Sequence, residues 1–144
     1  MNAPRGLVGW AFGVVLAAGS SAQQVYVVDS SGSGNFTDLQ NAIDTVPSGS
    51  TLRVLRKTGD WSPVTISGKS LTLVGDPRFR IDLSSSSLPC GPAISILGTG
   101  VEQVHLANFE SSGSCWARDP KPAIVATRLA LLHIADSNIA TGVG

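Results

Sequence analysis

The sequence predicts an all-β solenoid of about three coils, with one α-helix over its N-terminal end. Pro63, Pro92 and Pro122 each introduce a short apolar segment, at nearly equal spacings of about 30 residues, a length typical of solenoid repeats. A second and a third strand-like segment follow each of these after short polar connections. Such repeats bury their apolar side chains by stacking on the neighbouring repeat. A β-sandwich, with strands about every 8–12 residues, is the competing interpretation, but it does not explain why Pro-Ala-Ile recurs at 92 and 122.

Composition and charge narrow the class of protein. Few charges and many Ser, Thr, Gly, Val and Ile residues indicate a β-rich extracellular protein. Ten Lys and Arg residues balance ten Asp and Glu residues, and removal of Arg5 with the leader leaves nine against ten. Because a nearly neutral chain has no global field to attract nucleic acid or a charged membrane, the sequence predicts neither as a partner.

Residues 1–22 have the pattern of a secretory signal peptide. Arg5 precedes an uncharged run at 6–19, and the small residues at 20–22 suit cleavage after Ala22. A bilayer span requires about 20 apolar residues, which is longer than this run, and an uncleaved anchor is the alternative. We expect a mature domain at 23–144 that is secreted, periplasmic or on the cell surface and has no membrane contact after cleavage. Within it, 23–50 would form a strand and the capping helix, and 51–144 the coils.

The first segment of this domain predicts a strand, a turn and a helix in that order. The Val-rich run at 25–28 is typical of a strand, and the Gly, Ser, Asp and Asn residues at 29–35 are typical of a turn. Thr37 and Gln40 have capping-box spacing, which places the helix start at Thr37. A Pro-Ser-Gly sequence ends the helix, whose apolar stripe consists of Leu39, Ile43 and Val46.

The remaining strands follow from the repeat. Second strands are expected at 70–74, 103–107 and 131–135, and third strands at 78–83, 108–110 and 137–140. Alternate residues of a strand face the same side, so the expected inward columns are Leu71, Leu73, Val104, Leu106, Leu132 and Ile134. Asn108 and Asn138 are expected at bends, because Asn tolerates left-handed backbone angles.

The run at 25–76 resembles the start of right-handed parallel β-helix proteins of the pectin-lyase-like superfamily, especially their pectinesterase-like N-terminal segment. The resemblance lies in the strand-turn-helix start, in Gly59-Asp60-Trp61 and in the Leu-Thr-Leu-Val-Gly-Asp ending at 71–76. It implies a right-handed parallel β-helix whose N-terminal mouth is capped by the helix. Because lyases, hydrolases, esterases and inert structural proteins share these features, it implies no particular chemistry.

The sequence lacks the catalytic motifs of that superfamily. The strings QDTL and DFIFG of pectinesterases, the polygalacturonase-like NTD, DD, GHG and RIK, and the RxPxxR of pectate lyases are absent. The densest charged cluster, at 76–82, can be interpreted as an acid/base pair with an arginine clamp. Strand alternation favours a solvated face instead, with Phe79, Ile81 and Leu83 inside and Arg78, Arg80 and Asp82 outside. We therefore expect no catalytic residue and no cofactor.

His105 and His133 occupy the same place in successive coils, so stacking would bring their imidazoles together. Zinc sites use three or four protein ligands, and no Cys, Asp or Glu column accompanies this pair. The sequence predicts a surface ladder of two histidines and no metal.

Basic residues concentrate in one stretch of the chain. Six of the ten lie between positions 53 and 80, and Trp61 lies among them. Anionic polysaccharide can bind such a face through charge-assisted contacts and aromatic stacking. The alternative is a solvated surface with Trp61 covering the first coil, because acidic residues are interleaved. The predicted ligand surface consists of Arg53, Arg56, Lys57, Trp61, Lys69, Arg78 and Arg80.

Two further expectations concern cross-links and ends. Cys90 and Cys115 are separated by about one coil and predict a disulfide in an exported protein, with two free thiols as the alternative. A solenoid that ends on a strand at 139–144 would expose Leu132 and Ile134, which predicts self-association through the C-terminal edge.

The sequence therefore favours a secreted, non-catalytic β-helix module that is structural or carbohydrate-binding. The alternatives are a truncated or degenerate carbohydrate-active enzyme of the pectin lyase or esterase type, and an adhesive or assembly element.

Overall fold

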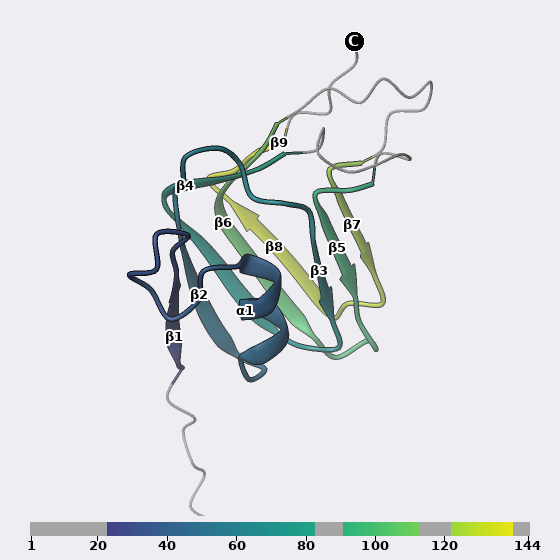
Figure 1. Cartoon of the computed structure of the whole chain (residues 1–144). Coiled ribbons are helices and arrows are strands. Elements are labelled where there is room, and N and C mark those ends of the chain that lie inside the picture. The colour runs from purple at the N-terminus through teal and green to yellow at the C-terminus, as the bar shows by residue number, and fades with distance from the viewer. Residues whose placement is uncertain (1–22, 83–90, 113–121, 140–144) are drawn as a thin grey trace, which may run out of the picture.

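The computed structural model describes residues 23–82, 91–112 and 122–139. The predicted signal peptide at 1–22, the inward position of Leu83 and the predicted disulfide between Cys90 and Cys115 lie outside these residues. The described chain is all-β, with two parallel sheets and one short helix (Figure 1). None of its helices has the length and apolar character required to cross a membrane.

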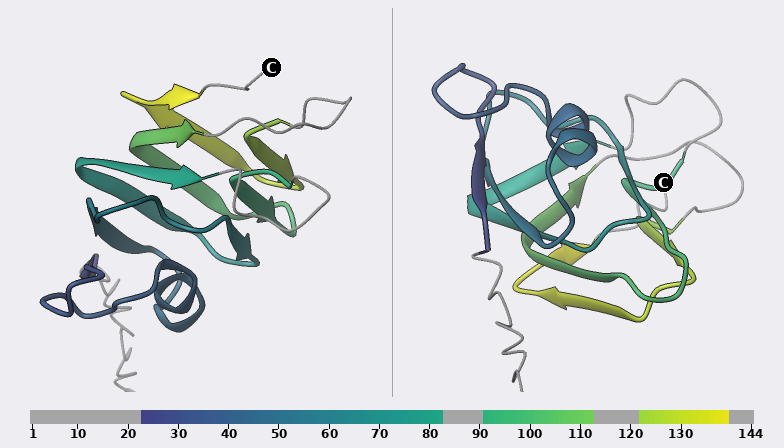
Figure 2. Two further views of the ribbon diagram at one scale, coloured as in Figure 1. Left: turned by 45° about the horizontal axis from the view of Figure 1, so that its top comes forward. Right: turned by 90° about the horizontal axis from the view of Figure 1, so that it is seen from below.

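The larger sheet is parallel throughout, because each of its strands pairs with a strand from the previous turn of the chain. It contains β1 (Val25–Val28), β2 (Ser50–Leu55), β4 (Leu71–Asp82), β6 (Gln103–Ser112) and β8 (Leu131–Ala135) in this order, and β9 (Asn138–Ile139) pairs with the end of β6. The smaller sheet contains β3 (Val64–Ser67), β5 (Ile94–Leu97) and β7 (Ile124–Thr127). From β2 to β8 the chain alternates between the two sheets, so neighbouring strands come from successive repeats (Figure 2).

The repeat in the sequence is a repeat of the structure. Val64 pairs with Ile94, and Ile94 pairs with Ile124, so both steps along the smaller sheet have the same length in the chain. The first proline spacing is one residue shorter than the second because Pro63 directly precedes its strand, whereas Ala93 separates Pro92 from Ile94. The strand register, and not the prolines, therefore sets the period.

The predicted inward columns are confirmed by register and burial. Leu71, Val104 and Leu132 are in register across β4, β6 and β8, as are Leu73, Leu106 and Ile134. The members on β4 and β6 are buried, whereas Ile134, on β8 at the end of the strand order, is 38% exposed. The charged segment of β4 alternates as expected, with Phe79 and Ile81 buried. The ring of Phe79 lies 5.3 Å from that of Phe109, so the columns continue into the second half of the sheet.

Helix α1 (Leu39–Thr45) lies at the N-terminal end of the stack, against β2 and β3 (Figure 2). The predicted apolar stripe is confirmed, since Leu39, Ile43 and Val46 are at most 2% exposed. The predicted capping box is wrong. Asp38 is the N-cap, with extended backbone angles and a carboxylate that accepts from the backbone N–H of Asn41 at 2.8 Å, because a carboxylate suits the positive end of a helix.

Gln40 has a different role from the predicted one. Its side-chain amide donates to the carbonyl oxygen of Thr65 at 2.9 Å, and its side-chain oxygen accepts from the N–H of Thr65 at 2.8 Å. These two bonds join the helix to β3, the first strand of the smaller sheet. The helix is therefore attached by a polar contact as well as by its apolar stripe.

The bends between strands confirm one of the two predicted positions. Asn108 has a φ of 54°, and its side-chain amide donates to the carbonyl oxygen of Gly75 in the previous coil. The prediction for Asn138 is wrong, because this residue lies in β9 and the left-handed residue at the bend before it is Asp136, with a φ of 48°. The pairing of Glu110 with Asn138 places Asp136 at the level of Asn108, and Asp tolerates the same conformation.

Candidate anion-binding pocket

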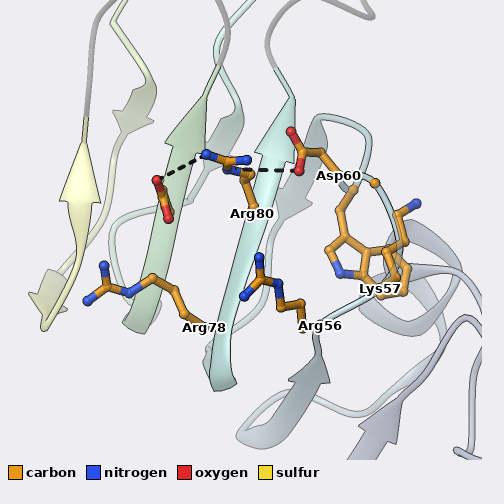
Figure 3. Close-up of a pocket in the computed structure, with 8 residues that line it drawn as sticks. Arg56, Lys57, Asp60, Arg78 and Arg80 are labelled. Atoms are coloured by element: carbon orange, nitrogen blue, oxygen red, sulfur yellow. Dashed lines mark hydrogen bonds and ion pairs between the residues drawn. The ribbon is translucent and has the colours of Figure 1, made fainter.

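A pocket of about 250 Å³ lies over the second half of β4, beside the chain that follows β2 (Figure 3). Five of the seven residues of the predicted ligand surface meet there. The lining residues are Arg56, Lys57, Gly59, Asp60, Trp61, Arg78, Arg80 and Glu110. Four cationic side chains thus face two carboxylates, so the pocket carries an excess of positive charge.

Strand pairing places Arg80 between two acidic residues, Asp60 and Glu110, at one side of this pocket. Trp61 bridges to Ile81, and β4 pairs with β6 so that Arg80 lies opposite Glu110. The guanidinium of Arg80 lies 3.9 Å from Asp60 and 3.4 Å from Glu110 (Figure 3). Each exposed pair of this kind contributes about 0–1 kcal/mol. The charge of Arg80 is therefore balanced, and its side chain holds both carboxylates in place.

The excess charge comes from Arg56 and Arg78, which lie beside Arg80 (Figure 3). Arg78 donates to the backbone carbonyl oxygen of Asp136 at 3.4 Å, a neutral partner. Among the described residues Arg56 makes no hydrogen bond or ion pair, and Arg78 makes no ion pair. Both guanidinium groups therefore retain donors for an anion.

Trp61 lines the pocket but is not a stacking platform. Its side chain is 3% exposed, and its indole N–H donates to the carbonyl oxygen of Leu55 at 3.3 Å. The ammonium of Lys57 lies 4.5 Å from the ring centroid, within the range of a cation–π contact. The aromatic stacking expected of Trp61 is therefore corrected, because its face is buried by the first coil and by Lys57.

Arg53 and Lys69 do not join the other five residues. Arg53 forms an ion pair with Asp76 outside the pocket. The ammonium of Lys69 donates to the carbonyl oxygens of Ile43, Asp44 and Val46 at 2.7, 3.0 and 3.0 Å. Neither Arg53 nor Lys69 therefore lines the pocket, and the ammonium of Lys69 lies at the end of the helix instead.

Sequence reasoning missed Glu110, whose contribution to the pocket depends on pairing between β4 and β6.

Sequence reasoning also missed Glu102, which precedes β6 and is 5% exposed. Its carboxylate accepts hydrogen bonds from the backbone N–H groups of Thr99, Gly100 and Val101. The Thr99 hydroxyl donates to the same carboxylate at 2.8 Å. Hydrogen bonds from Thr99 lower the pKa of Glu102 to about 2, and the bond from its hydroxyl has a larger effect than the bond from its backbone N–H. The Thr-x-x-Glu spacing was the signal that could have revealed this loop.

The two histidines are adjacent, as predicted. His105 on β6 pairs with His133 on β8, and their ring centroids lie 5.6 Å apart. In the described part of the chain, no group of three or more His, Cys, Asp or Glu side chains could hold a metal ion.

Comparisons of the chain with protein-family models, with curated proteins and with solved structures give no match. The function must therefore be inferred from the pocket itself. Its two carboxylates are engaged by Arg80, and its remaining cationic groups are hydrogen-bond donors. Chemically, this arrangement suits recognition of an anion with nearby hydroxyl groups.

Proposed function

We propose that this chain is a secreted, non-catalytic module that binds anionic polysaccharide in the pocket around Arg56 and Arg78. We also propose that its fold is a right-handed parallel β-helix of about three coils, related to the pectin-lyase-like superfamily. The observation that carries the binding function is the pair of guanidinium groups without carboxylate partners in a shared pocket.

The parallel pairing supports the proposed fold. From β2 to β8, successive strands of each sheet belong to successive repeats, and each connection passes through the other sheet. Connections between parallel strands of one sheet are right-handed in about 98% of cases, because strand twist favours that hand. A stack of coils with this hand and a helix at its first end is the architecture that the sequence resemblance implies.

The pocket suits one acidic sugar unit of a longer chain. Its volume of about 250 Å³ is below the range of roughly 300–1,000 Å³ typical of pockets for drug-sized ligands. Arg56 and Arg78 would donate to the sugar carboxylate through charge-assisted bonds. Asp60 and Glu110, held by Arg80, would accept bonds from sugar hydroxyl groups. A neutral sugar would leave the two cationic groups without a ligand, so selectivity for the acid follows.

Binding of a galacturonate oligomer to the secreted protein, followed by calorimetry, tests this function. Charge-assisted bonds contribute about 1.5–3 kcal/mol, so replacing Arg56 and Arg78 together with Gln should weaken binding at least tenfold. The matched control is Arg53→Gln, which removes the same charge from an arginine outside the pocket. Binding should also weaken with salt and vanish for the methyl-esterified oligomer.

Two results would contradict the proposal. Equal affinity for the acidic and the esterified oligomer would show that the arginines do not recognise the carboxylate. Cleavage or demethylation of the oligomer that depends on Asp60 or Glu110 would instead support the truncated-enzyme alternative.

A further inference from the structure

We propose that His105 and His133 form a two-imidazole site for an exchangeable divalent transition-metal ion, such as Zn²⁺, on the outer face of the larger sheet. This inference does not rest on the proposed polysaccharide site, because none of the residues that line that pocket is a histidine.

Strand register directs both side chains to the same place. His105 and His133 are partners in the parallel pairing of β6 with β8, and neighbouring strands lie about 4.8 Å apart. Val104 and Leu106, on either side of His105, are buried, so His105 faces outward. His133 has the same register and is exposed. Both imidazoles are thus held by backbone pairing and not by a loop.

The ring separation matches a shared ion. With metal–nitrogen bonds of about 2.0–2.1 Å, two imidazoles on one tetrahedral ion have ring centroids roughly 5 Å apart. The observed separation is 5.6 Å, with an angle of 55° between the ring planes. A small rotation of the side chains therefore suffices to direct one nitrogen of each ring at the same ion, without movement of the backbone.

The imidazoles have no competing partner among the described residues. Apart from their mutual ring contact, neither makes a hydrogen bond or an ion pair there. Because the described residues supply no third ligand, the site is open. Open sites exchange their ion and accept an outside ligand, whereas structural zinc sites are closed by four protein ligands.

The chain contains two histidines, so its imidazole NMR signals report on this pair alone. We expect the signals of both rings to shift together along one saturation curve when Zn²⁺ is added at neutral pH. Mg²⁺, which prefers oxygen ligands, should leave them unchanged. Because the second ring binds intramolecularly, His105→Ala and His133→Ala should each weaken Zn²⁺ binding about tenfold or more.

A matched control keeps two histidines but separates them. Leu131 faces outward on β8, two residues before His133, so Leu131→His combined with His133→Ala moves one ring out of register with His105. The proposal predicts that this variant binds Zn²⁺ as weakly as His133→Ala, with an unchanged backbone spectrum. If the out-of-register variant binds as tightly as the natural sequence, or if one ring responds to Zn²⁺ without the other, the pair is a stacked surface contact and not a metal site.

Discussion

Replacement of Lys69 with Met should destabilise the fold without weakening ligand binding. The Lys69 ammonium uses all three of its donors on carbonyl oxygens at the end of α1. The sequence assigned this residue to the ligand surface, whereas the structure makes it a C-terminal cap of the helix. The Lys69→Met substitution therefore distinguishes a role in ligand binding from a role in stabilising the helix.

The magnitude follows from these contacts. Hydrogen bonds from a charged group contribute about 1.5–3 kcal/mol each, and a cation near a helix C-terminus adds about 0.3–1 kcal/mol. Two offsets reduce the gain, because water can reach the Asp44 carbonyl and because ordering a Lys side chain costs about 1.5–2 kcal/mol. We expect a net loss of about 2 kcal/mol, which corresponds to a shift of about 1 M in the urea midpoint for a chain of this size.

Arg53→Met is the control in the same urea titration. Arg53 forms an ion pair in which both side chains are at least 40% exposed, and such pairs contribute about 0–1 kcal/mol. The reasoning is refuted if Lys69→Met shifts the midpoint no more than Arg53→Met does. It is also refuted if Lys69→Met weakens binding of the galacturonate oligomer, since the residue lies outside the pocket.

Three further predictions follow from single contacts. The lowered pKa of Glu102 means that its ionised form stabilises the fold above its ordinary value of 4.5 and that this contribution is lost as the pH falls towards 2. The urea midpoint should therefore fall more steeply between pH 4.5 and 2 in the natural sequence than in Glu102→Gln. A Cβ at Gly75 would lie 2.3 Å from the backbone oxygen of Asn108, so Gly75→Ala should lower the free energy of unfolding by about 1–3 kcal/mol or prevent folding. Gly91→Ala is the control, because no atom lies within 4 Å of the added Cβ, and it should leave the thermal denaturation midpoint nearly unchanged. If the chain self-associates at the edge strand β8, as the sequence predicts, Ile134→Lys should abolish the concentration dependence of the sedimentation coefficient. A natural sequence that is monomeric at high concentration would refute this prediction.

The sequence predicted the inward columns, because a constant period repeats the apolar alternation from coil to coil. It predicted the apolar face of the helix for the same reason. It was wrong to divide each of the first two coils into separate second and third strands, because β4 and β6 each run continuously through both predicted segments. The helix start was harder to locate, because Thr37 and Asp38 are both good N-cap residues. Which of them caps the helix depends on whether the Thr37 hydroxyl or the Asp38 carboxylate accepts a hydrogen bond from an unpaired backbone N–H of the first turn. Likewise, Asn108 and Asp136 occupy the equivalent bend in successive coils. The sequence signal at Asn138 could not show that the left-handed residue at this bend is Asp136.

The candidate pocket was harder to predict because its charge is distributed across coils. Asp60, Arg80 and Glu110 come from three separate segments of the chain but lie side by side in space. A count of basic residues along the sequence therefore includes Arg80, although Asp60 and Glu110 balance its charge. The contribution of Glu110 becomes visible only when β4 and β6 are paired. Cross-coil pairing thus selects which cations of a basic stretch can bind an anion.

The outward columns of the larger sheet follow the same rule. Cross-coil pairing places Glu110 opposite Arg80, and it places His105 beside His133. Both groupings depend on strand register, which also fixes the buried columns. The register that builds the inward columns of the core therefore also decides which outward side chains lie side by side.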